Sequence, residues 1–129
     1  MNQAHILIVE DESAQRRLIR DILTGQGHEV MEATGLASAT ERLAEGDIDV
    51  VISDWKLEDG DGSQVLGLVR EGYPETGFIM VTAYGSIAHA VSAIRSGADD
   101  YLAKPFERQA LLMALERTCL LYTSDAADD

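Results

Sequence analysis

Basic residues are scarce in this chain of 129 residues, which has 10 lysines and arginines against 23 aspartates and glutamates. The net charge of −13 argues against a domain that grips nucleic acid through a basic face, because such binding depends on neutralising phosphates. It fits a domain that attracts cations and docks with proteins, and at its simplest it keeps the chain soluble. We therefore expect no direct binding of nucleic acid.

The chain also lacks a disulfide framework and a membrane span. Its single cysteine, Cys119, excludes an internal disulfide and fits a reducing cytoplasm. No apolar run approaches the roughly 20 residues of a membrane-spanning helix. Residues 1–5 do not begin a signal-peptide pattern. We expect a cytoplasmic protein that does not associate with membranes.

No linker, low-complexity segment or repeat divides the chain, and its length fits one domain. Short apolar runs alternate with helical patterns that end near glycine. This regular alternation predicts an α/β fold, with a parallel sheet covered on both faces. We expect strands at residues 6–9, 29–33, 50–53, 78–81 and 101–103, and helices at 13–25, 36–45, 62–71, 86–96 and 107 to about 118.

The last residues, 119–129, differ from the rest and resemble the translation of a transposase-type sequencing adapter. We interpret them as a non-native tail, so that residues 1–118 form the domain; the alternative is an acidic C-terminal extension. Without them the chain has 10 basic and 20 acidic residues, and the argument from charge stands. Cys119 belongs to the tail, so it says less about the compartment of the native domain.

Charged and hydroxyl side chains follow four of the five expected strands. Glu10 and Asp11 follow the first, Asp54 the third, Thr82 the fourth and Lys104 the fifth. The carboxyl ends of parallel strands meet at one edge of the sheet, where open α/β sheets bind ligands. Three carboxylates, a hydroxyl and an ammonium at that edge predict a site for a divalent metal and a phosphoryl group.

Mg²⁺ is the expected metal, because it prefers oxygen ligands and keeps some of its waters. We expect Asp11 and Asp54 to bind it directly and Glu10 to bind through water. The backbone carbonyl of Lys56 is a plausible further ligand. The cation would relieve the repulsion between carboxylates packed this closely.

Asp54 is the expected nucleophile, since an aspartate carboxylate can attack phosphorus and form an aspartyl phosphate without a general base. Negative charge spreads over the phosphoryl oxygens in the transition state. Lys104 can bind one of these oxygens, and the Thr82 hydroxyl with backbone N–H groups can bind another. Each feature alone is common in loops, caps and turns, so the prediction depends on their joint position. The histidines, His5, His28 and His89, lack metal-ligand spacing, and we interpret them as structural or surface residues.

Together these residues resemble the receiver domain of two-component response regulators. The resemblance covers roughly residues 5–118, and the stretch from Thr82 to Phe106 looks most like receivers of the nitrogen-regulation type, which activate sigma-54 transcription. The matching segments are ILIVEDE (6–12), VISD (51–54) with DG (61–62), VTAYGS (81–86) and GADDYLAKPF (97–106).

The resemblance implies a flavodoxin-like fold, a five-stranded doubly wound parallel sheet of order 2-1-3-4-5 with five helices. It implies Mg²⁺ at Glu10, Asp11 and Asp54. It further implies phosphorylation of Asp54 by a histidine kinase or a histidine phosphotransfer protein. Self-phosphorylation and self-dephosphorylation would be the only chemistry of the domain, which is otherwise not an enzyme.

The resemblance also implies a switch. On phosphorylation Thr82 would move toward the phosphoryl oxygens, and Tyr101 would turn inward into the space that Thr82 leaves. Lys104 would pair with the phosphoryl group, and its peptide bond to Pro105 would be cis. The output face would comprise the fourth helix, the fifth strand and the last helix, and phosphorylation-dependent homodimerisation through this face is a further hypothesis.

Three positions depart from the family or tune it. Glu58 stands where many members have proline, which leaves the order of that loop open. Lys56 and Tyr84 occupy positions that control access of water to the phosphoryl group. The bulky Tyr84 predicts slow self-dephosphorylation.

Three other functions are alternatives to that of a receiver domain. A Mg²⁺-dependent phosphatase of the aspartyl-phosphate type usually has a second aspartate two residues after the nucleophile, where this chain has Lys56. A flavin carrier would need a Ser/Thr/Gly-rich loop in place of residues 10–12. A phosphate-independent, receiver-like adaptor would not need Asp54, Thr82 and Lys104.

Overall fold

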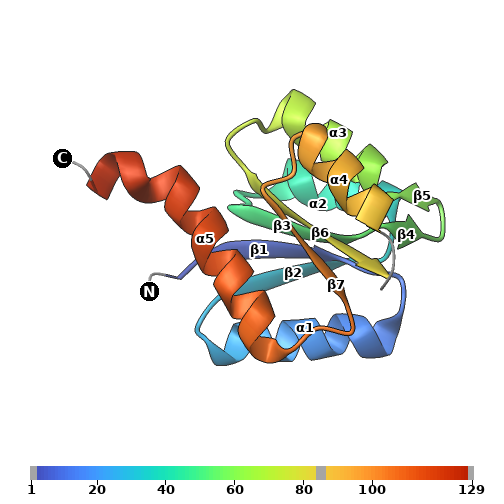
Figure 1. Ribbon diagram of the computed structural model, residues 1–129, viewed down its shortest axis with the longest axis horizontal. Coiled ribbons are helices and arrows are strands. Elements are labelled where there is room, and N and C mark those ends of the chain that lie inside the picture. Colours follow the sequence, from blue (N-terminus) through green and yellow to red (C-terminus); the bar gives the residue numbers. More distant parts are fainter. Residues whose placement is uncertain (1–2, 84–86, 128–129) are drawn as a thin grey trace.

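The computed structural model describes residues 3–83 and 87–127, and these form seven strands and five helices (Figure 1). The strands are β1 (His5–Val9), β2 (Glu29–Ala33), β3 (Val50–Asp54), β4 (Lys56–Leu57), β5 (Gly60–Asp61), β6 (Gly77–Ala83) and β7 (Asp100–Lys104). The helices are α1 (Ser13–Gly25), α2 (Leu36–Glu45), α3 (Gly62–Gly72), α4 (Ile87–Arg95) and α5 (Arg108–Ala127).

Five strands make one parallel sheet in the order β2-β1-β3-β6-β7. Counting only these five, the order is 2-1-3-4-5, and the predicted flavodoxin-like topology is confirmed. The direction of winding reverses between β1 and β3. In doubly wound sheets this reversal opens a crevice at the carboxyl ends of the strands, where ligands bind.

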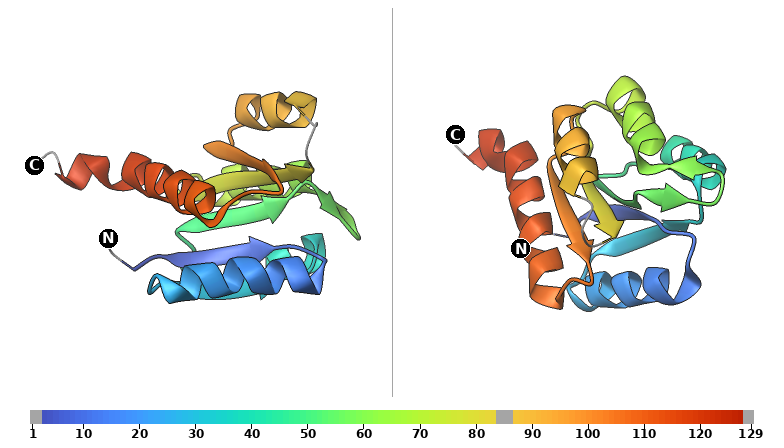
Figure 2. Two further views of the ribbon diagram at one scale, coloured as in Figure 1. Left: turned by 60° about the horizontal axis from the view of Figure 1, so that its bottom comes forward. Right: turned by 45° about the vertical axis from the view of Figure 1, so that its right-hand side comes forward.

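Helices cover both faces of the sheet (Figures 1 and 2). Along β1, Ile6 and Ile8 pack on the side of α1 and α5, whereas Leu7 and Val9 pack on the side of α2, α3 and α4. All four side chains are fully buried. This explains why the strand reads as a continuous apolar run, since alternate residues enter two different cores.

The short antiparallel hairpin of β4 and β5 differs from the loop that the sequence predicts for this segment. It pairs Lys56 with Asp61 and Leu57 with Gly60, and the buried Leu57 side chain anchors it in the core. At its tip, Asp59 accepts hydrogen bonds from the backbone N–H groups of Leu36 (2.6 Å) and Ala37 (3.0 Å). The hairpin therefore caps the N-terminus of α2, and these two bonds lower the pKa of Asp59.

Two expectations about the helices differ from the structure. α5 continues to Ala127 instead of ending near residue 118, because the segment contains neither glycine nor proline to stop it. In the sequence, Leu18 and Leu68 fall at helical spacing with the other apolar residues of α1 and α3, which predicts a shared apolar face, but both side chains are exposed. Each lies beside the buried residues of its helix, which are Ile19 and Leu23 in α1 and Gly62, Val65, Leu66 and Val69 in α3. None of the helices in the described ranges is long and apolar enough to cross a bilayer.

His28 is buried between α1 and β2, with 4% of its surface exposed. Its Nδ1 accepts a hydrogen bond from the backbone N–H of Ala4 at 3.0 Å, so the imidazole is neutral in this geometry. The Nε2 atom makes no hydrogen bond within the described part of the chain. Burial lowers the pKa of His28 below its ordinary value, because a charged imidazolium loses its hydration there.

We expect the folded protein to lose stability as the pH falls below about 6.5, the ordinary histidine pKa. In that range the unfolded chain binds a proton at His28 that the folded chain resists, so the free energy of unfolding decreases with decreasing pH. Urea unfolding between about pH 7 and pH 5 measures this slope. His28→Asn keeps an acceptor for Ala4 at the position of Nδ1 but cannot titrate, and it should show a shallower slope; an equal slope would show that His28 does not contribute.

Candidate functional site

The ends of β1, β3 and β7 bring Glu10, Asp54 and Lys104 together at one edge of the sheet. The Lys104 ammonium donates hydrogen bonds to Glu10 Oε1 at 3.0 Å and to Asp54 Oδ2 at 3.2 Å. β6 lies between β3 and β7, so the long lysine side chain reaches across the end of β6. The prediction that these strand ends meet at one edge of the sheet is therefore confirmed.

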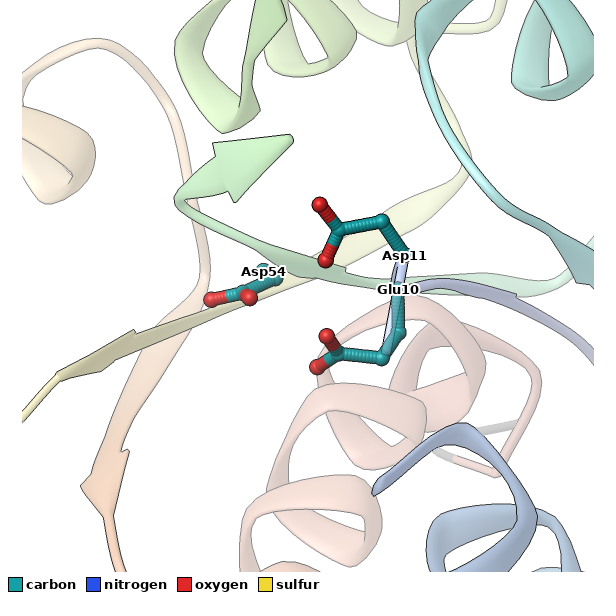
Figure 3. A group of neighbouring side chains, drawn as sticks. All are labelled: Glu10, Asp11 and Asp54. Atoms are coloured by element: carbon teal, nitrogen blue, oxygen red, sulfur yellow. The ribbon is translucent and has the colours of Figure 1, made fainter. Parts of the chain in front are cut away.

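Three carboxylates surround a common space at this edge (Figure 3). One oxygen from each of Glu10, Asp11 and Asp54 lies within 4.8 Å of the other two. Glu10 is buried, Asp54 is partly buried and Asp11 is exposed. The space between them is therefore open to solvent on the side of Asp11. Three oxygen donors at this spacing suit a hard divalent cation such as Mg²⁺.

Three carboxylates and one ammonium leave the charges at the site unbalanced, and the pKa values of Glu10 and Lys104 are both raised. Burial raises the pKa of Glu10 above its ordinary value, and the charge of Asp54 raises it further against the opposing hydrogen bond from Lys104. Burial alone would lower the pKa of Lys104, but its hydrogen bond to Glu10 and the two adjacent carboxylates outweigh that effect and raise it. Lys104 is therefore a permanent cation at neutral pH.

The remaining predicted residues occupy different places around this cluster. Thr82 is buried on β6, one residue before Ala83, whose register partner in β7 is Lys104. The peptide bond between Lys104 and Pro105 is cis, as the resemblance implies. Tyr101 is not at the cluster: it lies three residues before Lys104 on β7, with 43% of its surface exposed.

The predicted roles of Lys56 and Tyr84 stay predictions. Lys56 lies in β4, two residues after Asp54, and its carbonyl remains a predicted ligand. Tyr84 lies outside the described residues.

The main chain after Asp54 is held on both sides. The N–H of Trp55 donates to the Val81 carbonyl at 2.7 Å, and the Trp55 carbonyl accepts from the N–H of Gly62 at 2.7 Å. A Cβ atom at Gly62 would lie 2.7 Å from the Asp54 carbonyl oxygen and 2.5 Å from the Met80 sulfur. Only glycine fits this close approach, which explains the Asp-Gly step at the start of α3.

Arg16 also supports the site, and sequence reasoning missed it. Its Nη1 donates to the Glu10 carbonyl at 2.8 Å, and its Nε donates to Glu32 Oε1 at 2.9 Å. The guanidinium thus ties the end of β1 to α1 and to the edge strand β2. Arginine four residues into a helix has many uses, so only the folded arrangement shows this one.

The family model for the response regulator receiver domain matches residues 6–116. The response regulator protein FleR of Pseudomonas aeruginosa is 43% identical over 117 residues, which cover 91% of this chain and 25% of FleR. A chemotaxis protein CheY homolog of Campylobacter jejuni is 36% identical over 115 residues, covering 86% of this chain and 88% of that protein.

The crystal structure of the receiver domain of NtrX from Brucella abortus superposes with a TM-score of 0.85 at 35% identity. That match covers 88% of this chain and 97% of the NtrX domain. The match thus spans 88% of the CheY homolog but only a quarter of the length of FleR.

We expect Gly62→Ala to destabilise the fold, because its methyl group would displace the Asp54 carbonyl or Met80. Overpacking of this kind typically costs about 1–3 kcal/mol. Gly67→Ala in the same helix meets no atom within 4 Å and should stabilise by about 0.5–1 kcal/mol through helix propensity. Urea unfolding of both variants tests the contrast, and similar changes in the two would contradict the close approach at Gly62.

Proposed function

This chain belongs to the response regulator receiver domain family, and on that premise we propose that it is a phosphorylation-controlled binding module with Asp54 as its phosphoryl acceptor. The observation that carries the proposal is the Lys104 ammonium, which lies within hydrogen-bond distance of Asp54 at the edge of a three-carboxylate cluster. A nucleophilic carboxylate and a cation for the incoming phosphoryl oxygens are thereby in contact before any substrate arrives.

In the proposed reaction an Asp54 carboxylate oxygen attacks the phosphorus of a phosphohistidine. The donor is a histidine kinase or a histidine phosphotransfer protein. The O–P bond forms as the P–N bond breaks, and the electron pair of the broken bond stays on the imidazole nitrogen. The nucleophile needs no general base, because the carboxylate is already ionised.

Lys104 and Thr82 bind the negatively charged oxygens of the incoming phosphoryl group. The ammonium exchanges its bond to Asp54 Oδ2 for one to a phosphoryl oxygen, where it acts as a point charge. The Thr82 hydroxyl donates to a second oxygen. The residues suited to hold Mg²⁺ are Glu10, Asp11 and Asp54, with the Lys56 carbonyl as a further ligand. A bound Mg²⁺ would neutralise charge on the phosphoryl group.

The switch and its consequences belong to the same proposal. Thr82 and Tyr101 form the switch pair, and the exposed position of Tyr101 is consistent with the unphosphorylated arrangement. The output face consists of α4, β7 and α5, through which the phosphorylated domain would homodimerise. Self-phosphorylation and self-dephosphorylation are its only proposed chemistry.

We further propose a cytoplasmic protein that regulates transcription, since relatives of this chain are named response regulators and a transcriptional regulatory protein. The receiver comprises residues 1–118 in this proposal, with residues 119–129 as a non-native tail or an extension. The match to the family model ends at residue 116, which supports the boundary.

Incubation with acetyl phosphate and Mg²⁺ should add one phosphoryl group to the wild type, as measured by intact mass. Asp54→Asn should gain nothing, because the amide is not nucleophilic. Asp11→Asn keeps the acceptor but lacks one metal ligand, so its half-saturating Mg²⁺ concentration should rise roughly tenfold or more.

If the folded wild type gained no mass with acetyl phosphate and none with a competent kinase, the proposal would be wrong. A phosphate-independent adaptor would then be favoured.

A further inference from the structure

Two aromatic rings stack beside the phosphoryl acceptor. The Trp55 and His89 rings have centroids 4.3 Å apart and planes inclined by 13°. Trp55 directly follows Asp54, whereas His89 lies in α4. The contact therefore joins the segment after the acceptor to a helix that packs on the same face of the sheet (Figure 1).

Trp55 is firmly placed on its side of the stack. Both its N–H and its carbonyl are hydrogen-bonded at 2.7 Å, to Val81 and to Gly62, and its ring packs against the buried core. A displacement of the main chain at Asp54 is therefore transmitted to the indole ring.

On the other side of the stack, α4 buries only small side chains fully. Its fully buried side chains are Ala90 and Ala93, which are small and bury little apolar area. The periodicity groups Ile87, Val91 and Ile94 with Ala90, but these three side chains are 72%, 47% and 43% exposed. His89 is the helix's aromatic residue, and its ring joins α4 to Trp55.

We infer that the Trp55–His89 stack is a tether that holds α4 in its present position and opposes phosphorylation of Asp54, with His89 as a positioning residue. The inference rests on the proposed function and adds a connection separate from Thr82 and Tyr101. The present arrangement is the unmodified one, since Lys104 is bonded to the free Asp54 carboxylate.

Phosphorylation of Asp54 would disturb the stack. A phosphoryl group adds bulk and negative charge immediately before Trp55, so the segment must adjust. Stacking depends on the offset and inclination of the rings, and the adjustment weakens it. A contact that is stronger in the unmodified state disfavours the modified state by the same factor. An aromatic pair of this kind corresponds to roughly a two- to tenfold effect.

Four variants and two measurements test the tether. His89→Ala and His89→Gln remove the ring, His89→Phe keeps a stacking ring, and Ser92→Ala makes an exposed alanine substitution in the same helix. Trp55 is the only tryptophan, so its fluorescence emission reports the stack in unmodified protein. The initial rate of mass gain with acetyl phosphate and Mg²⁺ reports readiness for phosphorylation.

We expect His89→Ala and His89→Gln to be phosphorylated roughly two- to tenfold faster than wild type, with Trp55 emission shifted to longer wavelength. His89→Phe and Ser92→Ala should have rates close to wild type. If the alanine variant does not fold, the glutamine variant decides. An unchanged rate in the ringless variant, or an equal increase in His89→Phe, would overturn the tether alone. Failure of every protein to gain mass, including wild type, would overturn the proposed function and the tether with it.

Discussion

One ammonium among three carboxylates is the interaction around which the site is organised. Lys104 pairs with both Glu10 and Asp54, while Asp11 faces the open side without that cation in the described structure. Moving charges out of water is costly unless they are paired, and here the pairing is incomplete. Burial of Glu10 raises the pKa of its carboxyl group, and the nearby charge of Asp54 raises it further. The edge of the sheet is therefore suited to accept a cation, and Lys104 can turn to an incoming anion.

Hydrogen bonds to the backbone keep this unfavourable cluster in place. Arg16 holds the carbonyl at the end of β1, and the chain after β3 is fixed between β6 and Gly62. Burial of β1 and β3 on both faces supplies the rigid platform that these contacts extend. α4 is different: it buries mainly alanines and presents large apolar side chains to solvent. A rigid site next to a loosely held helix is an arrangement in which a local change of charge can move a surface.

Much of this was predictable because it depends on local patterns. The apolar runs predicted the five sheet strands, and residues placed just after them had to meet once the strands were parallel. Contacts between distant side chains were not predictable in this way. Nothing in the spacing of Trp55 and His89 indicates a stack, and nothing near Asp59 indicates that it caps α2. The hairpin of β4 and β5 is too short for a periodic signal, and α5 runs on because no residue stops it.

The most direct test of the account is a crystal structure of the protein with Mg²⁺ and beryllofluoride, a mimic of the phosphoryl group. The account predicts beryllium on an Asp54 carboxylate oxygen and the metal among Glu10, Asp11 and Asp54. It also predicts that the Lys104 ammonium has moved from Asp54 Oδ2 to a fluoride. A ligand bound elsewhere, or Lys104 still bonded to Asp54 beside a bound ligand, would contradict the role given to this edge of the sheet.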